Sequence, residues 1–334
     1  MRIGLFGGAT ANANGPDVDS GQNYKDFIEY IVEAEALGFY STFSAEHHFT
    51  GRGQVSATLS LLTWIGARTT TIRLGTAVLV LPWHNPVLVA EQVATIDLLS
   101  GGRVDLGVGK GYRQNEFRGF CIPQAEADAR FDEAIELMIK SWTSKERFSH
   151  HGSYWHFDDI VVEPPTTQIP HSPLWIGAGS EASIRGVARR GCKLLLDQFC
   201  SIQTVGERIN WYRDELERLG KPFNPMDVGV ARAFFVASSA EEKEMALDRR
   251  MKSQSALKKV SQDGNGTNKA SILTFADTRE ASEEATLFGS PDDIMEKIQQ
   301  LRNVGVEYLL VNGGGTDREQ LRSLARNVMP AFSA

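Results

Sequence analysis

Residues 39–51 read FYSTFSAEHHFTG, an apolar segment that ends in an acidic residue, two adjacent histidines and an aromatic residue. The aromatic and β-branched content of Phe39–Phe43 predicts a buried strand, and Glu46-His47-His48 follows where that strand should end. In parallel α/β folds, chemistry is located at the carboxyl ends of the strands. Imidazoles titrate near neutral pH and a carboxylate can orient them, so we expect Glu46, His47 and His48 to be catalytic. The alternative is that both histidines are solvated loop residues.

Strand-like and helix-like segments alternate on either side of this stretch. The predicted strands are Arg2–Phe6, Phe39–Phe43, Ile72–Leu81, Arg103–Gly109, Leu174–Gly177, Lys193–Leu196, Val228–Ala237 and Tyr308–Asn312. The predicted helices are Tyr24–Leu37, Ser56–Ala67, Val87–Leu99, Glu126–Trp142, Glu181–Arg190, Thr204–Leu219, Asp292–Asn303 and Asp317–Val328. Ser153–Val162 reads as a short β excursion. Eight βα units in 334 residues predict one α/β domain over residues 1–334, a (β/α)8 TIM barrel.

Residues 261–288, SQDGNGTNKASILTFADTREASEEATLF, interrupt this alternation. Glycines and asparagines lie at one end, acids at the other, and no regular period connects them. Long connections without regular structure inside a compact domain are commonly active-site lids. We therefore expect a mobile lid insertion here, with a surface loop of no role as the alternative.

Composition narrows the class of protein. The formal net charge is −7 and no lysine- or arginine-rich run occurs, which argues against nucleic acid or an anionic membrane as the partner. No apolar run is long enough to span a bilayer, and MRIGLFGGAT is too short in its apolar part for a signal peptide, so we expect a cytoplasmic protein. The three cysteines, Cys121, Cys192 and Cys200, have no zinc-site spacing, and we expect no metal site.

Two glycine-rich turns follow neighbouring predicted strands. Residues 107–113 read GVGKGYR and residues 177–183 read GAGSEAS. The second opens a helix, so Ser180 can cap that helix and an anion can bind at its amino end, with Lys110 adding positive charge. Neither turn matches a dinucleotide fingerprint or a Walker loop. The alternative is that these glycines only form tight βα turns.

Three stretches together resemble the bacterial luciferase-like flavin monooxygenases. They are AEHHFT at 45–50, LGTAVLVLP at 74–82, and DLLSGGR at 97–103, which leads into GVGKG at 107–111. Their order and spacing agree with that family, and weaker similarity extends over essentially the whole chain. The motifs are specific for the superfamily and not for a substrate.

The resemblance implies roles for individual residues. It places His47 near the reactive C4a edge of FMN and implies a non-proline cis peptide between Ala77 and Val78 beneath the flavin ring. The residues implied to bind FMN are Ala77, Val78, Lys110, Tyr112, Arg130, Gly179, Ser180 and Ser183. Lys110 replaces an arginine of luciferase, Gly179 a glutamate and Gln198 an aromatic residue, so light emission is not expected.

The resemblance also implies a reaction. Reduced FMN and O2 would form a C4a-peroxyflavin that oxygenates a small organic substrate, with proton transfer by His47, whose tautomer Glu46 or His48 would set. A separate NAD(P)H:flavin reductase would supply the reduced FMN. The family also implies a homodimer through helices near the second and third strands, where Thr58–Ile65 is apolar nearly all round.

Two other functions stay open. An F420-dependent hydride-transfer oxidoreductase uses the same barrel, although only Lys110, Arg113 and Arg118 are near enough in sequence to bind the acidic tail of F420. A non-catalytic flavin-binding protein is the other alternative. The complete Glu46-His47-His48 motif argues against it, because flavin storage needs no proton-transfer group.

Overall fold

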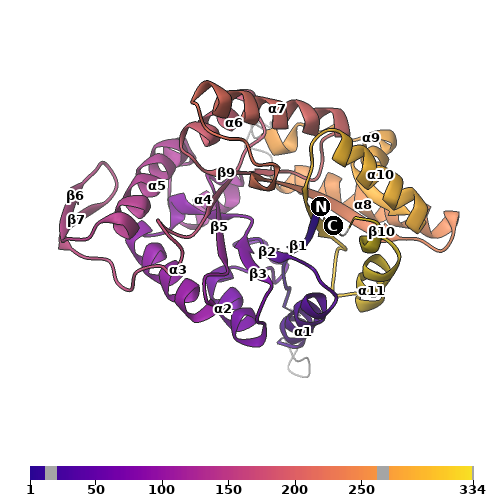
Figure 1. The fold of residues 1–334 in the computed structure, drawn as a ribbon, viewed down its shortest axis with the longest axis horizontal. Helices are drawn as coiled ribbons and strands as arrows, with labels where there is room; N and C mark the ends of the chain where they lie inside the picture. The colour runs from indigo at the N-terminus through magenta and orange to yellow at the C-terminus, as the bar shows by residue number, and fades with distance from the viewer. Residues whose placement is uncertain (12–20, 262–270, 333–334) are drawn as a thin grey trace.

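The computed structural model describes residues 1–11, 21–261 and 271–332, and its centre is a closed ring of eight parallel strands (Figure 1). The ring runs β1-β2-β3-β5-β8-β9-β10-β12, and β12 pairs again with β1. The ring strands are β1 (Arg2–Gly7), β2 (Ser41–Ser44), β3 (Arg73–Thr76), β5 (Val104–Gly109), β8 (Leu174–Gly177), β9 (Lys193–Leu196), β10 (Val228–Val236) and β12 (Tyr308–Asn312). The predicted TIM barrel is thereby confirmed: each ring strand overlaps a predicted segment, and β1 and β2 each extend one residue beyond theirs.

Helices alternate with these strands and surround them (Figure 1). They are α1 (Gln22–Ala36), α2 (Thr58–Arg68), α3 (Pro86–Ser100), α5 (Ala127–Thr143), α6 (Glu181–Arg189), α7 (Ile202–Arg218), α10 (Pro291–Asn303) and α11 (Arg318–Asn327). Polar caps fix where several begin: Asn85 accepts hydrogen bonds at the start of α3, and Ser290 forms a capping box at the start of α10. The amino terminus donates to the carbonyl of Phe332 at 3.1 Å, so the chain ends meet where the ring closes.

Further elements lie between the ring strands. They are β4 (Leu79–Val80), α4 (Gln114–Gly119), the antiparallel hairpin β6 (Phe148–His151) and β7 (His156–Ile160), α8 (Ala240–Val260), α9 (Arg279–Glu284), β11 (Thr286–Gly289), and the 3-10 turns η1 (Leu81–Trp83), η2 (Gln124–Glu126), η3 (Pro225–Asp227), η4 (Ser271–Leu273) and η5 (Met329–Ala331). The hairpin, which projects to the left in Figure 1, accounts for the predicted β excursion. No helix in the described ranges is long and apolar enough to cross a membrane.

The predicted lid at 261–288 needs correction at its carboxyl end. Thr286–Gly289 forms β11, which pairs in parallel with β10, and all four of its residues are buried. The helix α9 directly precedes it. The sequence prediction failed there because a four-residue strand next to acidic residues is too short to display a period. Residues 262–270 lie outside the described residues, so a lid over the earlier part of the segment stays a prediction.

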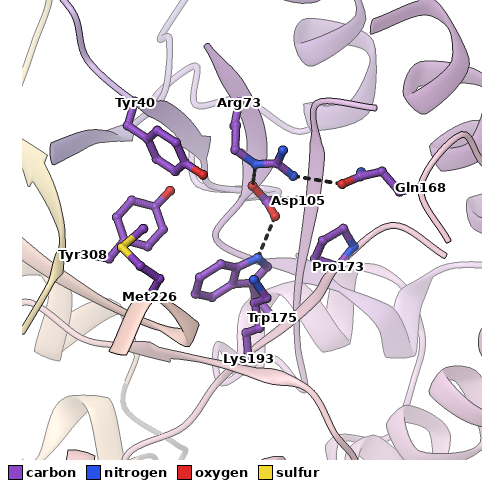
Figure 2. A pocket seen from close by; sticks show the side chains of 9 residues that line it. All are labelled: Tyr40, Arg73, Asp105, Gln168, Pro173, Trp175, Lys193, Met226 and Tyr308. Atoms are coloured by element: carbon purple, nitrogen blue, oxygen red, sulfur yellow. Dashed lines mark hydrogen bonds and ion pairs between the residues drawn. The ribbon is translucent and has the colours of Figure 1, made fainter. Parts of the chain in front are cut away.

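A polar cluster closes the amino-terminal mouth of the barrel (Figure 2). Asp105, only 3% exposed, accepts hydrogen bonds from Arg73 Nε at 2.5 Å and from Trp175 Nε1 at 3.0 Å. Arg73 also donates to Gln168 Oε1 at 3.2 Å. A pocket of about 240 Å³ lies beside them, lined by Tyr40, Arg73, Asp105, Gln168, Pro173, Trp175, Lys193, Met226 and Tyr308. Because the charged groups already have partners, we interpret this cluster as a structural plug.

Substituting Asp105 tests that interpretation. Asp105→Ala would leave a largely buried guanidinium and an indole N–H without their acceptor, and we expect a loss of about 3–5 kcal/mol in the free energy of unfolding. Urea denaturation measures this loss. Arg147→Ala is the control, because Arg147 pairs with Asp159 on the surface at 3.5 Å and should cost less than about 1 kcal/mol. Equal effects of the two substitutions would contradict a structural plug at Asp105.

Candidate active site

The predicted catalytic triplet lies at the opposite, carboxyl-terminal mouth, directly after β2. The loops that follow β3, β5 and β8 emerge at the same mouth, because these strands are parallel neighbours. The topology therefore brings the residues after Ser44, Thr76, Gly109 and Gly177 to one end of the barrel.

Glu46 is a buried anchor. Its carboxylate accepts hydrogen bonds from Val80 N at 2.7 Å, His48 Nε2 at 2.9 Å and His84 Nε2 at 2.7 Å, and the residue is 2% exposed. Burial opposes ionisation, but these hydrogen bonds outweigh it and hold the pKa of Glu46 below its usual value. Glu46 thus joins the β2 loop to the chain that follows β3.

His47 has a different carboxylate partner. Its Nδ1 lies 3.3 Å from Glu116 Oε1, and the same oxygen accepts the backbone N–H of His48 at 2.9 Å. Arg113 Nη1 lies 3.9 Å from this oxygen. An ionised carboxylate only accepts hydrogen bonds, so the His47 proton belongs on Nδ1 and Nε2 is the nitrogen left for chemistry. The expectation that Glu46 or His48 sets the His47 tautomer is therefore wrong: Glu116 occupies that position.

His48 is enclosed by aromatic rings. Its ring centroid lies 4.8 Å from Phe120, 5.5 Å from Trp83 and 5.8 Å from Phe49. Its Nε2 is hydrogen-bonded to Glu46, whereas Nδ1 has no hydrogen-bond partner among the described residues, so the surrounding rings and the Glu46 bond hold the side chain in place. This arrangement favours a packing role for His48 over a role in proton transfer.

The peptide bond between Ala77 and Val78 is cis, as the resemblance implied. Glycines on β5 permit the close approach of this segment. A Cβ atom at Gly107 would lie 1.8 Å from the carbonyl oxygen of Thr76, and one at Gly109 would lie 2.5 Å from Val78 Cγ2. The glycine-rich turn after β5 is thus required by packing as well as by its turn geometry.

The residues implied to bind phosphate come from β5, α5 and the start of α6. Lys110, whose side chain is 44% exposed, pairs with Asp128 at 2.6 Å. Arg130 pairs with Glu126 at 2.8 Å, and its guanidinium lies over the Tyr154 ring at 4.4 Å.

The predicted helix cap at Ser180 is confirmed. Ser180 and Ser183 form a capping box at the start of α6, directly after Gly179. Val108 of β5 pairs with Ile176 of β8, so the turns that carry Lys110 and Gly179 leave adjacent strands. Tyr112 lies in the turn after Lys110 beside Arg113, and burial raises the pKa of its hydroxyl.

Sequence reasoning missed two members of this site. Glu116 lies seven positions after Gly109 on the short helix α4, which was not predicted. His84, which is not among the predicted site residues, hydrogen-bonds the buried Glu46 carboxylate. A lone acid in the segment GYRQNEF was the available signal, but no spacing rule connects it to His47. In the described ranges, no group of three or more His, Cys, Asp or Glu residues could hold a metal ion.

The Glu46 network predicts an acid-dependent loss of stability. A carboxyl group whose folded pKa lies below its ordinary value of 4.5 stabilises the protein above that pH, and the contribution is lost as the pH falls through the folded pKa. We expect Glu46→Gln to destabilise the protein at pH 7, with a difference from wild type that shrinks below about pH 4.5. Urea denaturation at pH 7 and at pH 4 measures the difference in the free energy of unfolding between Glu46→Gln and wild type. The exposed Glu146→Gln is the control, and a Glu46→Gln effect independent of pH would contradict the assignment.

Comparisons with known proteins identify the family and the fold. The sequence model of the luciferase-like monooxygenase family matches residues 4–308. The chain is 28% identical to an FMNH(2)-dependent dimethylsulfone monooxygenase of Pseudomonas putida, over 79% of this chain and 75% of that protein. It is also 28% identical to an F420-dependent glucose-6-phosphate dehydrogenase of Nakamurella multipartita, over 92% of this chain and 93% of that protein.

One match is shorter: the chain covers 64% of an uncharacterized Sinorhizobium fredii protein, y4vJ, at 30% identity over 67% of this chain. Among solved structures, the monooxygenase RslO1 from Streptomyces bottropensis superposes with a TM-score of 0.85. The two are 24% identical over the whole of both chains. At that identity the similarity establishes the fold alone.

Proposed function

The chain belongs to the luciferase-like monooxygenase family, and on that premise we propose that it oxygenates a small organic substrate with reduced FMN and O2. The observation that carries the proposal is the His47–Glu116 pair at the carboxyl-terminal mouth, which leaves one imidazole nitrogen free for proton transfer. The similarity to an FMNH(2)-dependent monooxygenase supports FMN as the flavin.

The residues present suit FMN. Lys110, Arg130 and the Ser180–Ser183 cap would hold the phosphate, and Ala77, Val78 and Tyr112 would line the ring. Asp128 would have to release Lys110, which costs little because that ion pair is exposed. Glycine at 109 keeps the approach to Val78 open, where a Cβ atom would collide with it. The bound flavin would supply the activation of O2.

The chain's own residues then have separate tasks. His47 would donate or accept a proton at Nε2, while Glu116 holds the Nδ1 proton and so fixes the ring orientation. Arg113 Nη1, 3.9 Å from the same Glu116 oxygen, adds a positive charge beside this pair. Glu46 and His48 would act as positioning residues, because Glu46 is buried and hydrogen-bonded through both oxygens, and His48 is bonded to Glu46 and packed between aromatic rings.

Two partners follow from this proposal. The sequence has no nicotinamide-binding fingerprint, so a separate NAD(P)H:flavin reductase would deliver the reduced FMN. The organic substrate would bind at the same mouth as His47.

A second candidate is an F420-dependent hydride transfer. The observation in its favour is the 28% identity to an F420-dependent dehydrogenase across 92% of this chain. In that reaction His47 would again handle a proton at Nε2, and the difference would lie in the cofactor and the absence of oxygen incorporation.

Rapid mixing tests the monooxygenase proposal. The anaerobic complex with reduced FMN is mixed with oxygenated buffer, and a panel of small organic compounds is screened for those that change the rate of flavin reoxidation. We expect one class to accelerate reoxidation and to yield a product that carries ¹⁸O from ¹⁸O2. His47→Gln should lower that substrate-dependent rate roughly 10²-fold or more. Glu116→Gln should cause a smaller loss.

Unchanged affinity for reduced FMN in both variants separates this effect from lost binding. Reoxidation of the wild-type mixture as fast as that of free reduced FMN, with every compound, would contradict the proposal.

A homodimer through the outer faces of α2 and α3 is also proposed. Four large apolar side chains of these helices are exposed: Trp64 by 63%, Leu88 by 52%, Leu98 by 44% and Leu99 by 73%. The inner face of α2, with Leu61, Leu62 and Ile65, is buried against the chain's own core. The exposed residues therefore form a second apolar face that a partner subunit would cover.

Light scattering tests the dimer. Combining Trp64→Glu with Leu99→Glu would place charges in an apolar interface, so we expect the mass to fall from dimer to monomer without loss of helix content. Met245→Glu, at a residue 55% exposed on α8, is the control and should leave the mass unchanged. A monomeric wild type, or a mass unaffected by the double substitution, would refute this interface.

A further inference from the structure

Two neighbouring arginines, Arg232 on β10 and Arg250 on α8, lack any carboxylate partner among the described residues. Arg232 is 1% exposed and donates only to backbone carbonyl oxygens, those of Ala231 at 2.9 Å, Asp197 at 3.1 Å and Cys200 at 2.9 Å. Carbonyl groups satisfy hydrogen bonds but do not neutralise a charge. Arg232 therefore remains a buried, uncompensated cation.

Arg250 is still less satisfied. Its guanidinium carbon lies 5.0 Å from the centroid of the Phe199 ring, and its Nε and Nη2 atoms are buried with no hydrogen-bond partner in the described ranges. Burial, and then the charge of Arg232, lower the pKa of Arg250 to about 10. The side chain consequently stays charged at neutral pH.

Asp197, whose backbone carbonyl accepts from Arg232, has a carboxylate that is already engaged. Asp197 Oδ1 accepts the backbone N–H of Phe199 at 2.8 Å, and Oδ2 accepts Arg208 Nη1 at 2.7 Å. Asp197 thus neutralises Arg208, and in the described ranges no carboxylate forms an ion pair with Arg232 or Arg250. The remaining positive charge belongs to Arg232 and Arg250.

The unpaired positive charge of Arg232 and Arg250 lies at the mouth of the barrel that also holds the candidate active site. Phe199 follows three positions after Leu196, where β9 ends, and β9 pairs with β8, which leads to Ser180. Phe199 also stacks on Phe275, with ring centroids 4.5 Å apart and planes inclined by 19°. The unpaired guanidinium N–H groups therefore border an apolar aromatic wall.

We propose that Arg250, supported by Arg232, binds the anionic group of an organic substrate, a carboxylate or a sulfonate whose carbon skeleton packs on the Phe199 and Phe275 rings. A buried cation without a partner is costly, and an oxyanion that accepts two guanidinium hydrogen bonds would offset that cost. This inference rests on the proposed function, because it names the class of substrate that would bind at the same mouth of the barrel.

Ligand-dependent protection of the flavin-free protein is the first test. Thermal unfolding is followed in chloride buffer of constant ionic strength with added benzoate, benzenesulfonate or sulfate. We expect saturable protection of the wild type by the two organic anions. Arg250→Met should raise their apparent Kd roughly 10-fold or more. Arg249→Met is the control, because Arg249 is the exposed neighbour on the same helix and should change the Kd less than about twofold.

Comparing sulfate with benzenesulfonate distinguishes binding of an inorganic oxyanion from binding of an organic molecule that carries one. Protection by sulfate equal to that by benzenesulfonate would overturn the organic assignment. Equal protection of wild type and Arg250→Met would overturn the site itself.

Stability without ligand supplies a second readout. Met keeps the apolar stem beside Phe199 and removes an unpaired buried charge. In the same chloride buffer without added benzoate, benzenesulfonate or sulfate, Arg250→Met should therefore be at least as stable to urea as the wild type. A marked loss of stability would show that Arg250 is structural and overturn the proposal.

Binding of reduced FMN to the same proteins separates this inference from the proposed function. We expect Arg250→Met to bind reduced FMN as wild type does. A wild type that fails to bind reduced FMN, yet shows protection that depends on Arg250, would refute the proposed function while leaving the anion site. Normal FMN binding with no such protection would refute the anion site alone.

Discussion

The buried carboxylate of Glu46 is the interaction on which the candidate site depends. It receives the backbone N–H of Val80, two residues after the cis peptide, and so ties the loop after β2 to the segment after β3. Glu116, in the segment after β5, likewise accepts the backbone N–H of His48 and so ties that segment to the loop after β2. Two buried carboxylates therefore lock three βα loops together. Among the described residues, each histidine of the motif keeps one ring nitrogen without a hydrogen-bond partner, Nε2 in His47 and Nδ1 in His48.

The two mouths of the barrel differ in how completely their polar groups are satisfied. At the amino-terminal mouth, Asp105 has hydrogen-bond partners for both oxygens. At the carboxyl-terminal mouth, Trp83 Nε1, Arg113 Nε, Gln198 Oε1 and two nitrogens of Arg250 are buried without partners in the described ranges. Unsatisfied buried polar atoms are uncommon in folded proteins because each one lowers stability. These atoms lie on segments of the mouth that also carries His47, where a bound ligand would supply partners, whereas at the amino-terminal end Ser172 Oγ, just before β8, is buried without a partner in the described ranges.

The sequence was sufficient to predict the ring, because buried parallel strands such as Leu174–Gly177 and Tyr308–Asn312 are apolar runs bounded by turn residues. It was insufficient for Thr286–Gly289, which is too short to display a period, and no helix was predicted at Ala240–Val260, a segment dominated by charged residues. Proximity in sequence also led to a wrong prediction of the hydrogen-bond partner of His47. Glu46 and His48 flank His47 in the chain, but the carboxylate that reaches the His47 ring is Glu116, 69 positions away. Such pairings are set by the fold of the loops, which local patterns do not encode.

We propose that the carboxyl-terminal mouth binds reduced FMN in preference to F420, although relatives named for either cofactor are similar to this chain. Lys110 and the Ser180 cap suit a single phosphate, whereas the longer acidic tail of F420 requires more basic residues at the mouth. The most direct measurement is an anaerobic equilibrium titration of the protein with each reduced cofactor. We expect saturable binding of reduced FMN. Reduced F420 should bind at least roughly 10-fold more weakly, a difference of about 1.4 kcal/mol in binding free energy. Tighter binding of F420, or no binding of reduced FMN, would contradict this proposal.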